Sequence, residues 1–252
     1  MTWLIIFIFG LIIGSFLNAV IFRLKLNEQF IRGRSKCLNC QNELKAWDLI
    51  PVLSFIFLKG KCRYCHKAIS WQYPLLELAT GLVFLLGYFN LSYIKADFVF
   101  SYLTFIVFAC FLIIIFIYDL KYYLILDKVS LPAFTIALIL NVLLGYNVGN
   151  LLLASVIIGG FFGLQFIISQ GKWIGGGDIR LGLVMGAMLG WPLALVALFL
   201  AYILGAVFGL ILIISRRKDW QSQLPFGTFL TAATLIALLW GHEILSWYLT
   251  KL

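Results

Sequence analysis

Two aspartates set among long apolar runs are the first candidates for chemistry. Asp178 follows Gly175, Gly176 and Gly177 at the edge of one apolar run, and Asp119 closes another. A carboxylate at membrane depth is costly and indicates a functional site, and consecutive glycines let a substrate backbone approach closely. Two carboxylates in one site share a proton, so one can act as a base towards water and the other as an acid towards a carbonyl. The pair therefore predicts acid–base hydrolysis if the fold brings the two side chains together.

Structural roles explain the same residues. Asp178 is placed to cap the following helix, with the glycines serving only as a loop, and Asp119 can simply end its helix facing water. Asp127 is the rival to Asp119 for the first catalytic position. It lies just before a further apolar run that begins near Lys128, where the start of a helix favours an acidic residue. We assign Asp127 mainly to structure.

Four of the five cysteines form two Cys-x-x-Cys pairs, Cys37 with Cys40 and Cys62 with Cys65. Each pair can turn both sulfurs towards one ion, and two pairs complete a tetrahedral sulfur site suited to Zn²⁺. Four thiolates leave no open position for water, so the zinc would be structural. Disulfides are the competing interpretation, which a reducing cytoplasmic location disfavours.

The remaining metal-binding side chains offer little. His66 is able to replace a zinc ligand, but we interpret it as an exposed neighbour in the turn, and Cys110 as packing inside an apolar helix. The other histidine is His242, and no His-Glu-x-x-His helix is present. Hydrolysis by the two aspartates would therefore need no metal at the reaction centre.

Composition places the chain in a membrane. Its 252 residues are 63% apolar and only 12% charged, with a mean hydropathy of +1.05. Apolar runs of about 20 residues, the length that crosses a hydrocarbon core, recur along it. The first run, Thr2 to Phe22, lacks the basic start and the small-residue cleavage site of a signal peptide, so we interpret it as a retained span.

The predicted fold is an all-α polytopic membrane protein of about eight transmembrane helices, with a small cytoplasmic zinc-binding loop domain between the first and second. We expect spans near 2–22, 74–92, 98–118, 129–146, 151–168, 179–190, 192–214 and 226–249. Only Trp191-Pro192 separates the sixth from the seventh, so a seven-span count stays open. The predicted domains are an N-terminal region, 1–91, which contains the loop at about 23–73, and a membrane-embedded core, 92–252.

The basic residues predict the orientation. All but two of the 19 Lys and Arg residues fall on one side of this arrangement. They are Arg23, Lys25, Arg32, Arg34, Lys36, Lys45, Lys59, Lys61, Arg63, Lys67, Lys121, Lys128, Lys172, Arg180, Arg216, Arg217 and Lys218, against Lys95 and Lys251 on the other. Short basic loops stay in the cytoplasm, so both termini lie outside. Asp119 and Asp178, two spans apart, then meet the same cytoplasmic boundary. The net charge of +9 indicates topology and contact with the lipid bilayer, and we expect no nucleic-acid partner.

The motifs resemble those of a known family almost from end to end. The chain is similar to bacterial prepilin peptidases, also called type IV leader peptidases, which are intramembrane aspartyl proteases of the Gly-x-Gly-Asp class. The matching segments are Gly14-Ser15-Phe16-Leu17-Asn18, the two cysteine pairs, Trp47 to Ser54, Tyr73 to Leu78, Asp119, Gly175 to Asp178, and Leu224-Pro225-Phe226-Gly227. Many members have Ile-Pro-Asp where this chain has Ile125-Leu126-Asp127, and Cys-Pro-x-Cys where it has Cys37-Leu38-Asn39-Cys40. These departures change loop shape and remove no carboxylate or thiolate.

The resemblance implies Asp119 and Asp178 as the catalytic residues. The implied substrates are type IV pilin-like precursors, cut after a glycine at the cytoplasmic face of the bacterial inner membrane. Many members that carry the cysteine-bearing region also methylate the new N-terminus with S-adenosylmethionine, and the resemblance extends this expectation to the chain. No Gly-rich motif of the Rossmann type marks a methyl-donor site. The sequence gives no oligomeric state.

Two other classes of protein share some of these features. A transporter also interrupts its helices with glycines, as at Gly159-Gly160, and buries carboxylates, but near the bilayer midplane. A non-enzymatic scaffold with a zinc module would need the cysteines and not the aspartates. Separate substitutions of the cysteines and the aspartates distinguish these classes.

Overall fold

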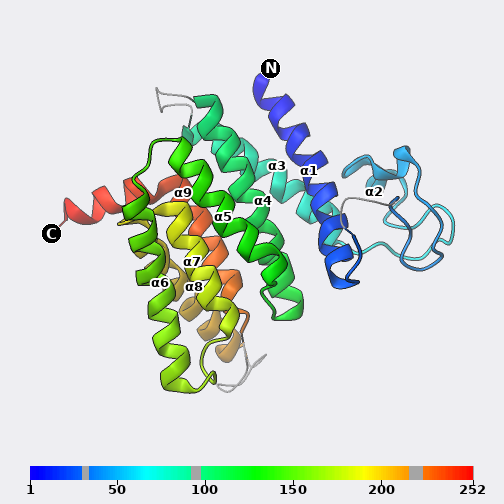
Figure 1. Ribbon diagram of the computed structural model, residues 1–252. Coiled ribbons are helices and arrows are strands. Elements are labelled where there is room, and N and C mark those ends of the chain that lie inside the picture. Colours follow the sequence, from blue (N-terminus) through cyan, green and yellow to red (C-terminus); the bar gives the residue numbers. More distant parts are fainter. Residues whose placement is uncertain (30–33, 92–97, 216–223, 252) are drawn as a thin grey trace. The chain divides into compact units, whose positions relative to one another are not determined.

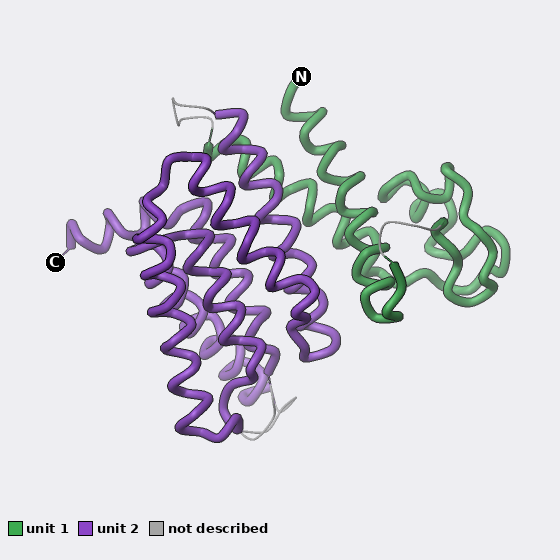
Figure 2. Tube along the Cα trace, in the orientation of Figure 1, with its two compact units in different colours: residues 1–93 green, residues 94–252 purple. Residues whose placement is uncertain are grey.

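The computed structural model describes residues 1–251 except 30–33, 92–97 and 216–223. This described chain is helical, and its only β-structure is two isolated bridges (Figure 1). It divides into two compact units, Met1–Tyr93 and Ile94–Leu252 (Figure 2). Five basic residues used for the orientation lie outside the described residues: Arg32, Lys95, Arg216, Arg217 and Lys218.

Unit 1 is built on two long helices joined by the cysteine-bearing loop. Its elements are α1 (Thr2–Lys25), the 3₁₀ helix η1 (Ala46–Leu49), α2 (Leu53–Phe57) and α3 (Gln72–Leu91). Helices α1 and α3 pack closely because glycines of α1 lie against the backbone of α3. A Cβ at Gly10 would lie 2.7 Å from the Cα of Gly81, and one at Gly14 would lie 2.8 Å from the Cα of Glu77. Glycines four residues apart on one helix face allow this approach, as they do in many membrane helix pairs.

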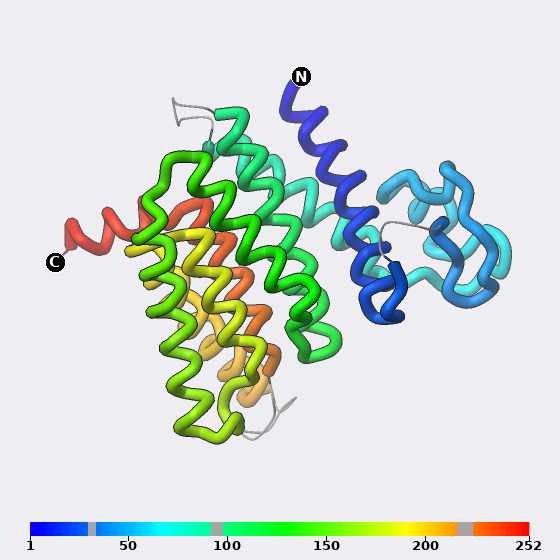
Figure 3. The backbone as a smooth tube through the Cα atoms, viewed as in Figure 1, coloured from blue at the N-terminus to red at the C-terminus, as the bar shows by residue number. Residues whose placement is uncertain are grey.

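Unit 2 is a bundle organised around its shortest helix. Its elements are α4 (Phe98–Tyr122), α5 (Asp127–Leu143), α6 (Val148–Ser169), α7 (Gly176–Leu189), α8 (Leu193–Ile214) and α9 (Phe226–Leu249). Helix α7, yellow in Figure 3, packs against α5, α6, α8 and α9. Gly186 on α7 meets the backbone of Ser155 on α6, and a Cβ at Gly182 would lie 2.8 Å from the ring of Phe162. Close packing on several sides makes α7 the core of the unit.

The end of α7 is fixed by polar groups. The side-chain amide of Asn141 on α5 donates to the carbonyls of Ala187, at 2.7 Å, and Met188, at 3.1 Å. These carbonyls lie in the last turn, where the helix itself supplies no partner. Gly190 follows with φ of +65°, a conformation that glycine adopts without strain. Helices α7 and α8 are therefore separate, and the merged helix of the seven-span alternative is not observed.

A helix occupies each of the eight expected segments, but the described helices differ in whether they are long enough to cross a membrane. Six of them, α1, α3, α4, α6, α8 and α9, are long and apolar enough to cross a membrane. Helix α5 has 17 residues and α7 has 14. At about 1.5 Å per residue, α7 is about 21 Å long, against about 30 Å of hydrocarbon. Because its neighbours bury most of its surface, α7 does not have to match the lipid by itself.

Candidate active site and cysteine cluster

Asp119 lies near the end of α4 and is 4% exposed. Its Oδ2 accepts hydrogen bonds from the backbone N–H of Thr228, at 2.7 Å, and from the Thr228 hydroxyl, at 3.1 Å. Thr228 is in the first turn of α9, whose N–H groups have no partner within the helix and whose dipole favours a negative charge. The start of α9 therefore holds the Asp119 carboxylate in a single orientation.

Asp178 lies in the first turn of α7 and is 8% exposed. Its Oδ2 accepts a hydrogen bond of 3.0 Å from the backbone N–H of Gly175, the residue before the helix. This is the contact of a helix-capping carboxylate, so the capping role considered for Asp178 is present in the structure. Among the described residues, no hydrogen bond reaches Oδ1 of Asp178 or of Asp119. Each carboxylate is thus anchored by one oxygen and leaves the other for a ligand.

Ile125 links the surroundings of the two aspartates. A Cβ at Gly177, next to Asp178, would lie 2.8 Å from the Cβ of Ile125. A Cβ at Gly227 would lie 2.8 Å from Cδ1 of Ile125 and 2.9 Å from Oδ2 of Asp119. The carboxylates are also near enough for the charge of Asp119 to act on Asp178. The end of α4 and the starts of α7 and α9 therefore place both side chains at one end of unit 2, the lower end in Figure 1.

The three glycines before Asp178 differ in their surroundings. A Cβ at Gly176 would meet no atom within 4 Å, and one at Gly175 would lie 3.6 Å from Oδ2 of Asp178. Only Gly177 is packed closely, against Ile125. The open backbone face beside Asp178 is therefore at Gly176, whereas Gly177 is explained by packing within the chain.

Asp127, the rival for the first position, lies elsewhere in this region. It is in the first turn of α5, and its carboxylate pairs with Arg180 on α7. Both side chains are nearly half exposed, at 49% and 44%. Asp127 thus has a cationic partner and contact with solvent, unlike the buried carboxylates of Asp119 and Asp178.

Thr228 is a functional candidate that the sequence analysis did not name, and Gly227 and Ile125 appeared there only as members of motifs, without a role. Gly227 ends the Leu224-Pro225-Phe226-Gly227 motif, and Thr228 follows it directly. The motif therefore pointed to the neighbourhood of Thr228. The role of Thr228 as the hydrogen-bond donor to Asp119 could not be read from the sequence, because the two residues are 109 positions apart in the chain. Gly227 has no space for a Cβ beside Asp119, which explains why glycine ends the motif.

The four cysteines of the loop converge. The sulfurs of Cys37, Cys40, Cys62 and Cys65 all lie within 4.8 Å of one another, and the thiols are free. The Sγ atoms of Cys37 and Cys65 are 3.8 Å apart. Four sulfurs at about 2.3 Å from a tetrahedral Zn²⁺ are about 3.8 Å from each other, so the cluster fits such an ion. These cysteines are therefore able to bind a metal.

The two cysteine pairs form matching turns. In the first, the N–H of Cys37 donates to Asn42 and the N–H of Gln41 donates to Cys37; in the second, Cys62, Lys67 and His66 repeat this pattern. Gln41 and His66 have nearly equal positive φ angles, +57° and +56°. His66 is exposed at the turn. The matching turns direct both sulfur pairs to one point. His66 forms part of the second turn through its backbone N–H, which donates to Cys62.

Electrostatics favour the thiolate form of Cys37 and Cys65. The backbone N–H of Asn42 acts to lower the pKa of Cys40, but burial and the neighbouring cysteines raise the pKa of Cys40 to about 11. Burial opposes ionisation of Cys37, but the backbone N–H groups of Cys40 and Asn39 lower its pKa to about 6. The backbone N–H of Lys67 lowers the pKa of Cys65. Metal ligation requires the thiolate form.

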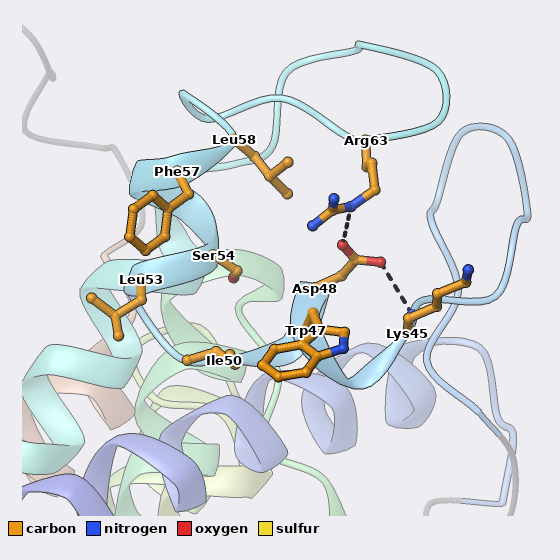
Figure 4. Close-up of a pocket in the computed structure, with 9 residues that line it drawn as sticks. All are labelled: Lys45, Trp47, Asp48, Ile50, Leu53, Ser54, Phe57, Leu58 and Arg63. Atoms are coloured by element: carbon orange, nitrogen blue, oxygen red, sulfur yellow. Dashed lines mark hydrogen bonds and ion pairs between the residues drawn. The ribbon is translucent and has the colours of Figure 1, made fainter.

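Asp48 ties the second cysteine turn to η1. Its carboxylate accepts hydrogen bonds from Nε of Arg63, at 2.6 Å, and from the N–H of Lys45, at 3.1 Å (Figure 4). The hydroxyl of Tyr64 donates a third hydrogen bond, at 3.3 Å. The Asp48 side chain is 3% exposed. Burial opposes its ionisation, but Arg63 and the Lys45 N–H hold the pKa of Asp48 below its ordinary value.

Asp48→Asn is expected to loosen this loop at neutral pH. It breaks a buried, charge-assisted contact, and we expect a loss of about 1–3 kcal/mol in the free energy of unfolding of the loop. Thermal melting and limited proteolysis of purified protein measure the change. A carboxylate with a lowered pKa stabilises the fold above its unfolded pKa of about 3.9, and that contribution is lost as pH falls through the lower folded value. The difference between wild type and variant should therefore vanish only in strong acid.

Glu43→Gln is the matched control, because Glu43 pairs with Arg34 in the same loop at an exposed site. Exposed pairs contribute about 0–1 kcal/mol, so this variant should melt close to wild type. Equal effects of the two substitutions would contradict the role given to Asp48.

Comparisons with known proteins agree on one family. Residues 8–91 match the profile of the bacterial peptidase A24 N-terminal domain, and residues 106–210 match that of the type IV leader peptidase family. A prepilin leader peptidase/N-methyltransferase of Aeromonas salmonicida is 34% identical over 100% of this chain and 96% of that protein. The protein of the same name from Bacillus subtilis is 34% identical over 97% of both chains. The chain belongs to this family.

Membership in the prepilin leader peptidase/N-methyltransferase family makes the chain an enzyme and a multi-pass membrane protein. The matched leader peptidase segment contains Asp119 and Asp178, and the matched N-terminal domain contains all four loop cysteines. Thr228 and Gly227 lie beyond the matched peptidase segment. The contact between the start of α9 and Asp119 is therefore seen in the structure and not in the family match. No solved structure shows a significant match to the chain.

Proposed function

We propose that Asp119 and Asp178 form the catalytic pair of an intramembrane aspartyl peptidase that removes the leader from type IV pilin-like precursors. The observation that carries this proposal is the pair itself. Two buried carboxylates lie at one end of unit 2, each anchored through Oδ2 by a helix-start N–H and each with Oδ1 left for a ligand. Family membership supports the reaction class.

The chemistry needs one ionised and one protonated carboxyl. Two carboxylates in one site favour sharing a single proton between them, because like charges repel. The ionised member removes a proton from a water held between the Oδ1 atoms, while the protonated member donates to the oxygen of the scissile carbonyl. The water oxygen adds to the carbonyl carbon, and the C–N bond breaks as the amine takes up a proton. Gly175 and Gly176 would leave the extended cleavage-site backbone room beside Asp178.

The substrate geometry suits a site at the cytoplasmic boundary of the bacterial inner membrane. The six helices of spanning length would cross the membrane, and α5 and α7 would be embedded among them, shielded by neighbours. Both termini would lie outside and the cysteine loop in the cytoplasm. A precursor with a basic leader and an apolar stem would place its junction at this boundary, leader in the cytoplasm and stem in lipid. Residues 92–252 are then the peptidase core.

Residues 1–91 would carry the second part of the function. One structural Zn²⁺ bound by the four cysteines would hold the loop in its fold. The name of the relatives includes N-methyltransferase, and we propose that this chain also methylates the newly exposed N-terminus with S-adenosylmethionine as donor.

Co-expression with a pilin precursor tests the peptidase proposal. We expect the mass of the pilin to fall by the mass of its leader, with a further methyl group on the new N-terminus, as measured by mass spectrometry. A transporter or a zinc-bearing scaffold would leave the precursor uncut. Uncut precursor beside membrane-inserted, zinc-loaded protein would therefore contradict the proposal.

A further inference from the structure

Unit 1 contains a cavity of about 670 Å³ where α1 and α3 meet the cysteine loop. Its size is within the range of small-molecule sites, about 300–1,000 Å³. The lining residues that matter here are Ser15 and Asn18 of α1, Tyr73 and Glu77 of α3, and Cys37 and Cys62 of the loop. A metal-stabilised loop thus forms one wall of a cavity whose floor is membrane helix.

Glu77 is a buried carboxylate facing this cavity, 6% exposed. Its Oε2 accepts a hydrogen bond of 2.7 Å from the N–H of Val52, and the Ser15 hydroxyl is a second partner. Val52 has a φ of +61°, a rare conformation for a β-branched residue, so the bond helps fix the start of α2. A glutamine oxygen would accept the same bonds, and this structural role alone does not require a charge.

The charge of Glu77 has no partner in the described chain. The ion pairs among the described residues involve Glu43, Asp48 and Asp127, and none involves Glu77. A buried carboxylate without a cation is expensive, whereas a paired one is tolerated. Basic residues also line the cavity, among them Arg23 of α1 and Lys36 of the loop, but none forms an ion pair with Glu77 in the described chain. The part of the cavity beside Glu77 is therefore suited to a ligand group that carries a positive charge.

The reaction proposed for unit 2 produces such a ligand. Peptide cleavage leaves an α-ammonium group at the top of an apolar stem that remains in the bilayer. Glu77 is in the second turn of α3, about 8 Å along the axis from the start of the helix at about 1.5 Å per residue. If the start of α3 lies at the membrane boundary, Glu77 lies about 8 Å inside it, which is within reach of the N-terminus of an apolar stem held in the bilayer.

We infer that Glu77 binds the α-ammonium of the cleaved precursor in this cavity and accepts its proton before methylation. The inference deepens the proposed methyltransferase function and rests on it. The N–H bond breaks and the proton passes to the Glu77 carboxylate. The amine lone pair then forms a bond to the methyl carbon of a sulfonium donor while the C–S bond breaks. The donor leaves as a neutral thioether, the product is a methylated ammonium, and Glu77 returns its proton to water.

Binding measurements separate charge recognition from catalysis. The probes are a synthetic apolar stem peptide with a free N-terminus and the same peptide N-acetylated, added to protein in detergent free of amino lipids. We expect wild type to bind the free amine at least about tenfold more tightly, since one charge of a buried pair is absent from the acetylated peptide. Glu77→Gln should bind both peptides equally, and Glu243→Gln, at an exposed site on α9, should behave as wild type. Equal binding of both peptides by wild type would overturn the inference.

Methyl transfer from radiolabelled S-adenosylmethionine to the free peptide is the second measurement. Glu77→Gln should reduce it about 10²- to 10⁴-fold, the range for loss of a general base, while precursor cleavage continues. Asp119→Asn should show the reverse pattern, with no cleavage and intact methylation of the supplied peptide. Undiminished methylation by Glu77→Gln would refute the role of Glu77. Cleavage by wild type without any methylation would refute the methylation site and leave the peptidase proposal intact.

Folding is checked by zinc content and melting temperature, because Gln keeps the bond to Val52. If Glu77→Gln does not accumulate, Glu77→Asp replaces it. This variant keeps the carboxylate, but its side chain is shorter by one methylene. The rate of methylation should therefore fall while precursor cleavage stays unchanged. Equal methylation by Glu77→Asp and wild type would count against the inference.

Discussion

Asp119→Asn and Asp178→Asn are each expected to lower leader cleavage by about 10²- to 10⁴-fold, the contribution of a positioned acid or base. Asparagine keeps the size of the side chain and an oxygen for the Thr228 or Gly175 N–H, so the helix starts stay anchored. It cannot take a proton from water or hold one for the carbonyl. The measurement is the fraction of co-expressed precursor cut, at equal levels of membrane-inserted, zinc-loaded enzyme.

Asp127→Asn is the matched control, since it makes the same substitution in the same region of unit 2. It removes only an exposed ion pair with Arg180 and should retain substantial cleavage. An inactive Asp127→Asn together with an active Asp119→Asn would show that the first catalytic position is Asp127, and the pair would become Asp127 with Asp178.

The double variant tests whether the two aspartates act as one unit. If they share a single proton and a single water, either loss disables the whole step, and the second adds nothing. Asp119→Asn with Asp178→Asn should therefore be no less active than the worse single variant. A double variant whose loss equals the product of the single losses would indicate two independent contributions.

The positions of the helices were predictable from the sequence, because about 20 apolar residues have few alternatives to crossing a bilayer. Which helix would form the core of unit 2 was not predictable. Helix α7 is the shortest expected span, and its central place depends on Gly182 and Gly186, whose value is visible only when α6 lies against them. Eight spans were expected, but only six described helices are long enough to cross a membrane. The difference also depends on packing, because a helix that its neighbours shield from lipid does not need about 20 apolar residues.

The candidate site was predictable in part for a related reason. An acidic residue at the edge of an apolar run is conspicuous wherever it occurs, so Asp119, Asp178 and Asp127 were all visible. The partner of Asp119 was not, because Thr228 is a common residue that becomes special only through its place at the start of α9. Glu77 was visible only as part of a motif. Its burial, its bond to Val52 and its lack of a cation are properties of the folded loop.

The joint variant Cys37→Ser and Cys40→Ser is expected to lose the metal and unfold the loop. Purified wild type should contain about one zinc per chain, and this variant close to none, by elemental analysis. The loop has little else to hold it, since its described regular structure is a four-residue 3₁₀ helix, a five-residue α-helix and two isolated bridges. Segments with so small a core normally depend on a metal or disulfide. Cleavage at the loop by added protease should therefore accelerate in the variant.

Cys110→Ser is the matched control, because Cys110 lies inside α4 and is not part of the four-cysteine cluster. It should keep the full zinc content, and undiminished zinc in the Cys37→Ser and Cys40→Ser variant would refute the assignment of the site. A chelator makes the further distinction between structural and catalytic metal. Four thiolates leave no position for a reacting water, so chelation should act slowly, through unfolding of the loop, if it affects leader cleavage at all. Immediate inhibition that added zinc reverses at once would instead place a metal at the reaction centre and exclude the aspartate pair as the sole catalytic groups.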